Sequence, residues 1–330
     1  VNLTTMKILP SDVNMTNAYN AMYKTIMVAN DIIDGMKSST IEQGVDKNRI
    51  QGEAYFIRAV TYFNLVRLFG DLEQAWNLLP EKADKVDGRP YRYAAKAVRA
   101  KVYLTLAGNM TENETDYWQK CYDDAFDVYH NGGYELVYPY SKLFGSENKN
   151  NAESVFEIQF SSAVNSGRLT ETTFPVGHEL MSNIPTQGKS WGKTRPSQRA
   201  FDQFEAGDPR REATFVYQSY NNIYESEAKK KVMLYPSVKN DGNGTYKQGD
   251  SEYAAWKKYY DTSMTARGSS ANFVYMRFAD VVLILAEAAN ELSEHHSEAV
   301  GYLNEILTRA ADANGNGVRD TEETVPADVD

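Results

Sequence analysis

QGEAYFIRAVTYFNLVRLF, the stretch from Gln51 to Phe69, carries an apolar side chain at every third or fourth position. That spacing places these side chains along one face of a helix. The face consists of Tyr55, Ala59, Tyr62, Val66 and Phe69. A second row widens it and consists of Phe56, Val60 and Phe63. We therefore predict a helix from about Lys47 to Phe69 that is covered on two sides.

The same periodicity recurs on both sides of this stretch. It predicts further helices over 14–36, 91–106 and 116–131. Gly132-Gly133 is a strong C-terminal stop for the last of these. Helical order is expected to return at Tyr275, with a break at His295-His296. Helices of this length in pairs, joined by short loops, predict a mainly α fold, a tetratricopeptide-like helical-pair scaffold (an α-α superhelix).

The middle of the chain lacks this periodicity. Residues 153–160 are typical of a short strand, and residues 161–272 are rich in Gly, Asn, Ser, Pro and aromatic side chains. An irregular stretch of this length inside an ordered chain usually carries function. We expect one domain over 1–330, with N-terminal helical pairs up to residue 160, an irregular, loop-rich ligand-binding region, and an incomplete helical pair over 273–330.

Composition narrows the class of protein. Of 330 residues, 42% are apolar and 24% are charged, a globular balance. The net charge of −10 argues against nucleic acid, which needs clustered Lys and Arg. The single cysteine, Cys121, excludes an internal disulfide and a cysteine-based zinc site. No apolar run is long enough to span a membrane, and residues 1–10 lack signal-peptide features, so the protein is cytosolic or has lost a targeting segment.

The sequence offers no convincing catalytic centre. It contains no nucleophile elbow, phosphate loop or dinucleotide fingerprint, and its four histidines show no metal-motif spacing. Asp280 and Glu287 share a predicted helical face, about 10.5 Å apart along the axis. Structural charge pairing explains these carboxylates better than hydrolysis. We therefore expect a binding protein, not an enzyme, that requires no cofactor.

The sharpest local pattern begins at Asp312 and matches a calcium-binding loop of EF-hand type. Oxygen ligands are expected from Asp312, Asn314, Asn316, Val318, Asp320 and Glu323. Gly317 would permit the sharp turn that such a loop needs. The alternative is a polar loop whose Asn and Gly residues only favour turns. A structural Ca²⁺ is therefore one of two interpretations of this loop.

Two sets of residues in the irregular region have side chains of the kinds that bind sugars. Sugar rings stack on aromatic faces while polar side chains bind their hydroxyls. Trp191, flanked by Gly188 and Gly192 and followed by Arg195, fits this pattern. A second group consists of Tyr217, Tyr220 and Tyr224, with Asn221 and Asn222. The alternative is that these rings anchor a region that lacks a regular core.

Several segments, in order along the chain, resemble the SusD/RagB family. The first is Ile50 to Gly70, which contains the stretch from Gln51 to Phe69. The second runs from Gly88-Arg89-Pro90 to Leu104. A third is Phe201-Asp-Gln-Phe-Glu205 with Gly207-Asp-Pro-Arg-Arg211. The fourth is Tyr275-Met-Arg-Phe-Ala-Asp280 with Leu285-Ala-Glu-Ala288 and Leu303-Asn-Glu305. Their shared order makes the resemblance specific.

The resemblance implies a lipid-anchored protein of the outer membrane, at the cell surface of Bacteroidetes-type bacteria. It implies that the protein captures oligo- or polysaccharide and delivers it to a SusC-like TonB-dependent transporter. Relative to the family, we expect the anchoring cysteine to be missing, and residues to be missing near Gly70-Asp71 and after Asp330. Two alternatives remain: a helical-repeat scaffold that binds peptides or proteins, and a glycoside hydrolase.

Overall fold

The computed structural model divides the chain into two compact units. One unit, called here the helical unit, comprises Val1–Tyr134 and Asp280–Tyr302; the other, called the mixed unit, comprises Glu135–Ala279 and Leu303–Asp330. The structure describes residues 13–41, 44–65, 70–81, 88–108, 114–161, 166–167, 187–188, 194, 196–205, 207–216, 218–220, 232–234, 239–240, 245–246, 254–261, 264–266 and 268–320.

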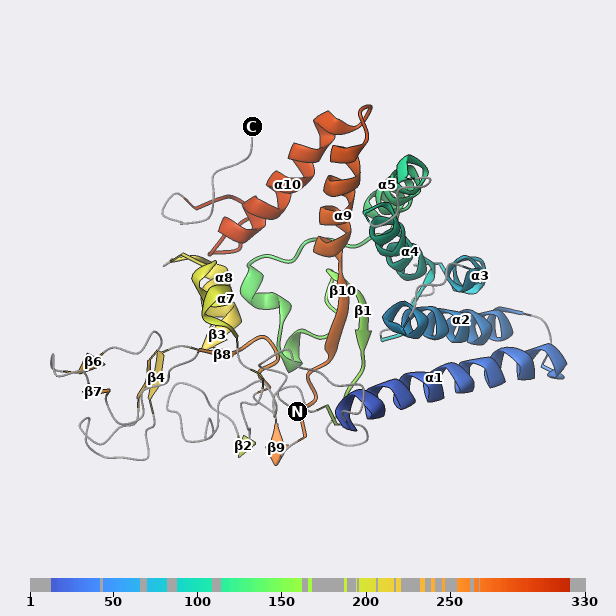
Figure 1. The fold of residues 1–330 in the computed structure, drawn as a ribbon, viewed down its shortest axis with the longest axis horizontal. Helices are drawn as coiled ribbons and strands as arrows, with labels where there is room; N and C mark the ends of the chain where they lie inside the picture. The colour runs from blue at the N-terminus through green and yellow to red at the C-terminus, as the bar shows by residue number, and fades with distance from the viewer. Residues whose placement is uncertain are drawn as a thin grey trace. The chain divides into compact units, whose positions relative to one another are not determined.

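The helical unit begins with helices that pack one after another along the chain. These helices are α1 (Val13–Ser38), α2 (Val45–Leu65), α3 (Gly70–Leu78), α4 (Arg92–Ala107) and α5 (Glu114–Asn131). Each lies beside the next, as Figure 1 shows, and each consecutive pair is in contact. This stacking of neighbours is the arrangement that the apolar stripes predict, and it confirms the mainly α, helical-pair fold.

Small apolar residues let these helices approach closely. The buried face of α4 consists of Ala94, Ala95, Ala97, Val98, Ala100, Val102 and Ala107. Cys121 on α5 is fully buried and its thiol donates a hydrogen bond to the Ala100 carbonyl, so it is a core residue, and burial raises the pKa of its thiol. The predicted stop is confirmed, since α5 ends at Asn131 and Gly133 has a φ of 64°.

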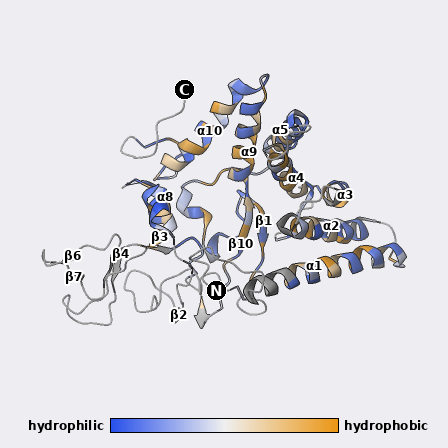
Figure 2. Cartoon of the chain, in the orientation of Figure 1, coloured by the Kyte–Doolittle hydropathy of each residue, from blue (hydrophilic) through white to orange (hydrophobic). Residues whose placement is uncertain are grey.

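The two late helices are α9 (Phe278–Glu291) and α10 (His296–Ala311). Apolar residues at helical spacing form a buried stripe along α9 and at its C-terminal end, which consists of Phe278, Val281, Leu285, Ala288 and Leu292. Figure 2 shows apolar and polar residues alternating around α1 and α10, as amphipathic helices require. No helix in the described part of the chain is long and apolar enough to cross a membrane.

The mixed unit is built around one antiparallel strand pair, β1 (Ser154–Ile158) and β10 (Phe273–Arg277). The predicted strand over 153–160 is thereby confirmed. The prediction that helical order returns at Tyr275 is wrong, because Tyr275 lies in β10 and the helix begins only at Phe278. Pairing with β1, which is distant in sequence, supplies the hydrogen bonds that hold these residues extended.

Short elements fill the rest of the mixed unit. Its helices are η3 (Tyr140–Leu143), η4 (Ser146–Asn148), α7 (Gln198–Asp202) and α8 (Pro209–Thr214). Its short strands are β2 (Gln187–Gly188), β3 (Phe215–Val216), β4 (Gln218–Tyr220), β5 (Val232–Leu234), β6 (Lys239–Asn240), β7 (Thr245–Tyr246), β8 (Ala255–Trp256) and β9 (Thr265–Ala266). Ser197 and Asp208 cap α7 and α8 through their side chains.

The stretch from Gln51 to Phe69 is described over most of its length. The described part of α2 runs to Leu65, and residues 66–69 lie outside the described residues. A further helix, α3, begins at Gly70, and the expectation of missing residues near Gly70-Asp71 stays a prediction. Phe56 and Ala59 on α2 are buried, so both rows of the stretch reach the core.

Candidate functional site

The sugar-binding residues expected from the sequence fall almost entirely outside the described part of the structure. Trp191, Arg195, Tyr217 and Tyr224 lie outside the described residues. Tyr220 ends β4, where it is paired with Val232 of β5, but its side chain is not among those described. Their role in ligand binding therefore stays a prediction.

A buried carboxylate organises the described part of the mixed unit. Glu153, which immediately precedes β1, is completely buried. One of its oxygens is 2.8 Å from Arg277 Nη1 on β10, and the other is 2.7 Å from Arg309 Nη1 on α10. The second oxygen also accepts a hydrogen bond of 3.0 Å from the Val137 amide. Glu153 thus joins segments that are far apart in sequence.

Aromatic rings surround these two arginines. The Arg309 guanidinium lies 5.2 Å from the ring centre of Tyr140, and the Arg277 guanidinium lies 5.8 Å from that of Phe144. Lys258 Nζ lies 4.9 Å from the Phe144 ring and 5.6 Å from the Tyr140 ring. Cations placed over ring faces in this way are stabilised by the ring quadrupole. The Glu153 carboxylate and the aromatic rings therefore both stabilise the two guanidinium groups.

A polar network continues from this cluster along β1. The buried Glu157 carboxylate accepts hydrogen bonds from the Asn150 amide at 3.1 Å and from Asn272 Nδ2 at 2.8 Å. Asn272 Nδ2 also donates to Gln159 Oε1 at 2.8 Å. A small cavity of about 10 Å³ lies beside Glu157 and Lys258, roughly the space of one water molecule. These groups bind one another, so the arrangement is an anchor for the strand pair.

The expected calcium loop follows α10 and is described as far as Asp320. The Asp312 carboxylate is buried and accepts backbone hydrogen bonds from Gly315, Asn316 and Gly317 at 2.6, 3.2 and 2.7 Å. The φ of Gly317 is 78°, a left-handed conformation that glycine adopts without strain. Asp320 Oδ2 accepts a hydrogen bond of 2.9 Å from the Ala313 amide. The loop is therefore folded around its two aspartates.

The ligand set of this loop is only partly described. Glu323, which would close the site, lies outside the described residues. Among the described residues, no three His, Cys, Asp or Glu side chains converge as a metal site. The other expected ligands are Asn314, Asn316 and the Val318 carbonyl, which are not of those types. A structural Ca²⁺ therefore stays a proposal.

Titration with calcium tests this proposal. If the loop binds Ca²⁺, we expect saturable heat in calorimetry and a higher melting temperature, because an ion that binds only the folded state stabilises it. Asp320→Asn should remove the heat, since it takes away one charged ligand. The matched control is Asp123→Asn on α5, an exposed carboxylate far from the loop in sequence. Absence of heat in the unchanged protein would leave only the turn-forming interpretation.

A second cluster lies in the helical unit, where α5 meets the segment between α9 and α10. The ring of His295 stacks on that of Tyr122 at 3.8 Å, and His295 Nδ1 is 2.9 Å from Glu298 Oε1. The Tyr122 hydroxyl donates to Glu298 Oε2 at 2.7 Å. Hydrogen bonds from His295 and then Tyr122 lower the pKa of Glu298, whereas burial and the bond to Glu298 raise the pKa of Tyr122.

Sequence reasoning missed both clusters, for a common reason. The sequence marked His295 only as part of a break between two helices, whereas its ring packs on Tyr122. Glu153 was noted only as the start of the predicted strand over 153–160, and Arg309 was not singled out. A charged residue directly before an apolar strand is a signal that could have marked Glu153, because a charge that is buried beside such a strand must be paired. Its partners could not be identified without the fold.

The stacked helices with an irregular, strand-paired second unit define a helical-repeat scaffold of the kind that proteins use for binding. A family model described as "SusD family" matches residues 152–325, and a second, described as "Starch-binding associating with outer membrane", matches residues 2–72. The first match covers more than half of the chain. The protein therefore belongs to the SusD family.

Relatives and solved structures agree with this assignment. The chain is 27% identical to a "SusD-like protein" of Bacteroides ovatus, over 93% of this chain and 61% of that protein. A crystal structure described "with xylogluco-oligosaccharide" has a TM-score of 0.72 at 22% identity, over 92% of this chain and 66% of the other. A SusD superfamily protein from Parabacteroides distasonis has a TM-score of 0.72 at 20% identity, over 98% of this chain and 71% of the other. The chain thus spans about three fifths of the curated relative's length.

Proposed function

We propose that this protein captures glycans without cleaving them. Membership of the SusD family carries the proposal, because a family model matching its N-terminal part is described as starch-binding. A structural neighbour that is described with a xylogluco-oligosaccharide supports the same ligand class. The particular glycan that this chain binds is left to experiment.

Capture of this kind requires shape and stacking and no reactive group. Aromatic side chains supply flat apolar surfaces for the C–H faces of sugar rings, and polar side chains bind the hydroxyls. The proposed contacts are Trp191, Arg195, Tyr217, Tyr220 and Tyr224, all in the irregular region. The buried carboxylates of Glu153 and Glu157 are already held in ion pairs or hydrogen-bond networks with other side chains.

The proposal extends to the place of the protein in the cell. We propose that it works at the cell surface, on an outer membrane, held by a lipid anchor, and that it delivers its ligand to a SusC-like TonB-dependent transporter. The description of the second matching family, which associates with the outer membrane, supports this location. Co-purification of the transporter encoded beside the gene would test the partnership.

Affinity gel electrophoresis tests glycan capture and the role of Trp191 together. We expect retardation of the unchanged protein by one or more of xyloglucan, starch and related polysaccharides. Loss of a stacking ring should weaken binding about tenfold or more in Trp191→Ala, with an unchanged melting temperature. The matched control is Trp256→Ala, which removes a ring that packs on Phe215 at 5.5 Å and is expected to affect stability first.

Two outcomes would redirect this proposal. Binding to a panel of peptides, with no glycan retarding the protein, would favour the peptide-binding scaffold. Release of reducing ends from a glycan would favour a hydrolase. If Trp191→Ala keeps full affinity while glycan binding persists, capture stands and the stacking residue lies elsewhere.

A further inference from the structure

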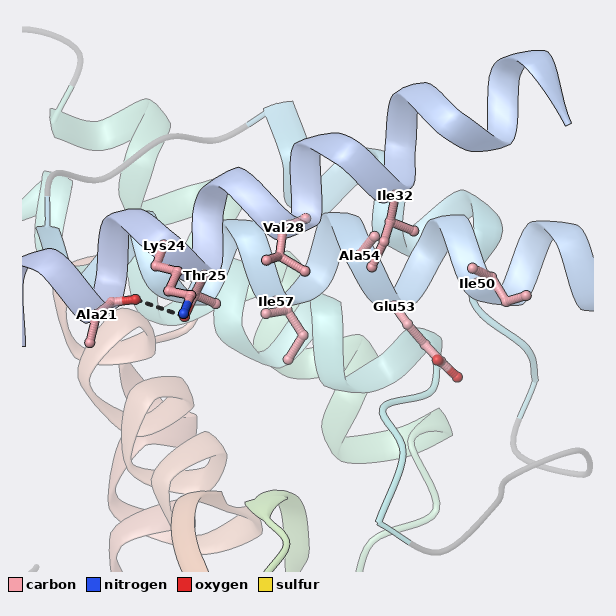
Figure 3. A pocket seen from close by; sticks show the side chains of 10 residues that line it. Ala21, Lys24, Thr25, Val28, Ile32, Ile50, Glu53, Ala54 and Ile57 are labelled. Atoms are coloured by element: carbon pink, nitrogen blue, oxygen red, sulfur yellow. Dashed lines mark hydrogen bonds between the residues drawn. The ribbon is translucent and has the colours of Figure 1, made fainter. Parts of the chain in front are cut away.

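The helical unit carries an apolar groove on the outer helix pair. It runs between α1 and α2 and has a volume of about 600 Å³. Figure 3 shows its lining, with α1 and α2 running antiparallel along its two sides. The lining residues are Ala21, Lys24, Thr25, Val28, Ala29, Ile32, Ile50, Glu53, Ala54 and Ile57. Most of them are aliphatic.

This lining does not suit a sugar. Among the described residues that line it there is no aromatic ring, and the polar side chains there are Lys24, Thr25 and Glu53. Thr25 already donates to the Ala21 carbonyl at 3.0 Å. Glu53 is 2.7 Å from Arg89. A ligand rich in hydroxyl groups would lose its hydration here and regain few hydrogen bonds. The groove therefore fits an apolar surface, such as the side of a helix.

The position of α1 in the stack explains why no other described helix covers its outer face. α1 packs extensively against α2, whereas α2 also packs against α3, and α4 lies between α3 and α5. A helix at the end of a stack normally presents a polar outer side. Here Val28 and Ile32 keep 47% and 37% of their surface exposed, and the neighbouring Met27 keeps 54%. An apolar end face of this kind marks an interaction surface.

We propose that this face, formed by α1 and α2, binds the same face of a second copy of the chain. The face supplies both halves of such a contact: Val28 and Ile32 as projecting apolar side chains, and the small Ala21, Ala29 and Ala54 as the floor that receives them. In a two-fold contact each surface must be complementary to itself, and this one is. The inference does not depend on glycan binding.

The charged residues of the groove are compatible with the same two-fold contact. Lys24 lies toward one end of the groove and Glu53 toward the other, as Figure 3 shows. A two-fold axis that lies in the plane of the contact and runs across the two helices would bring Lys24 of each copy to the end of the groove where Glu53 of the other lies. The Glu53 carboxylate can accept this cation in addition to Arg89, because it has several lone-pair sites. Opposite charges at both ends fix the register of the two copies.

The area of the face is close to the area that a stable interface buries. From the rise of an α-helix, α1 with 26 residues is roughly 39 Å long and α2 with 21 residues roughly 32 Å long. With a width of about 10 Å for each helix, the face measures about 700 Å². A stable interface buries about 800 Å² on each partner. The α1–α2 face thus accounts for most of what a stable dimer needs.

Sedimentation velocity over about 1 to 100 μM tests the dimer. We expect the mass to rise from 37.2 kDa to twice that value, with a dissociation constant on the order of micromolar. Val28→Asp combined with Ile32→Asp should raise that constant by more than about 100-fold. The matched control is Leu283→Asp on α9, an exposed apolar residue of the same unit, which should leave it unchanged.

The charge arrangement gives a second variant that does not touch the apolar side chains. Lys24→Glu places like charges together at both ends and should weaken association about tenfold or more at low salt. Circular dichroism of each variant shows whether the helices remain folded. A single 37.2 kDa species for the unchanged protein at all concentrations would overturn the proposal. So would a dimer that survives the Val28→Asp and Ile32→Asp changes, because it would use another face.

Discussion

Glu153→Gln should lower the free energy of unfolding by about 3–5 kcal/mol, the range for removing one partner of a buried ion pair. The change leaves Arg309, which is 3% exposed in its side chain, and Arg277 without the carboxylate that lies 2.7 and 2.8 Å from them. It also weakens the acceptor of the Val137 amide. Urea denaturation followed by circular dichroism and tryptophan fluorescence measures the loss.

The control for this prediction is an ion pair on the protein surface, exposed to solvent. Asp116 and Lys120 on α5 are 2.6 Å apart, and both are about half exposed. Asp116→Asn should cost about 0–1 kcal/mol, since solvent screens the pair. An equal decrease in the free energy of unfolding in the two variants would contradict the view that Glu153 holds β1, β10 and α10 together.

Gly52→Ala should destabilise the helical unit, although alanine favours helices over glycine. A methyl group on Gly52 would lie 2.9 Å from the Leu79 amide nitrogen and 3.1 Å from the Leu78 carbonyl carbon. These are backbone atoms at the end of α3, so α3 itself must move. Overpacking of this kind costs about 1–3 kcal/mol. Thermal unfolding measured by circular dichroism at 222 nm would report it.

Gly35 on α1 provides the matched control, because it is a helical glycine with open space around it. A methyl group there meets nothing within 4 Å. Gly35→Ala should therefore stabilise the protein by about 0.5–1 kcal/mol, through helix propensity alone. Opposite signs for the two substitutions would support the close packing of α2 on α3. Stabilisation by both would contradict it.

Local periodicity predicted the helices well, because each helix buries a stripe that is visible in the sequence. The stripe of α9 from Phe278 to Leu292 is an example, since every member proved to be buried. The stop at Gly132-Gly133 was equally visible, because glycine readily adopts a left-handed conformation. These features depend on residues only a few positions apart.

Features that depend on distant residues were not predictable in this way. Residues 273–277 read as the start of a helix because an apolar helical stripe follows them directly, yet pairing with β1 makes them a strand. The ion pair between Glu153 and Arg309 joins residues 156 positions apart, so no local pattern marks it. The expected ligand-binding residues of the irregular region, such as Trp191, remain predictions because they lie outside the described residues.

Glycan capture without cleavage is the central claim, and one paired measurement tests it most directly. A xylogluco-oligosaccharide and a starch-derived oligosaccharide would each be titrated into the protein by calorimetry, and the same mixtures would then be assayed for reducing ends. We predict saturable binding of at least one of these or a related glycan, with no increase in reducing ends over time. Absence of binding to every glycan tested, or steady release of reducing ends, would contradict the account.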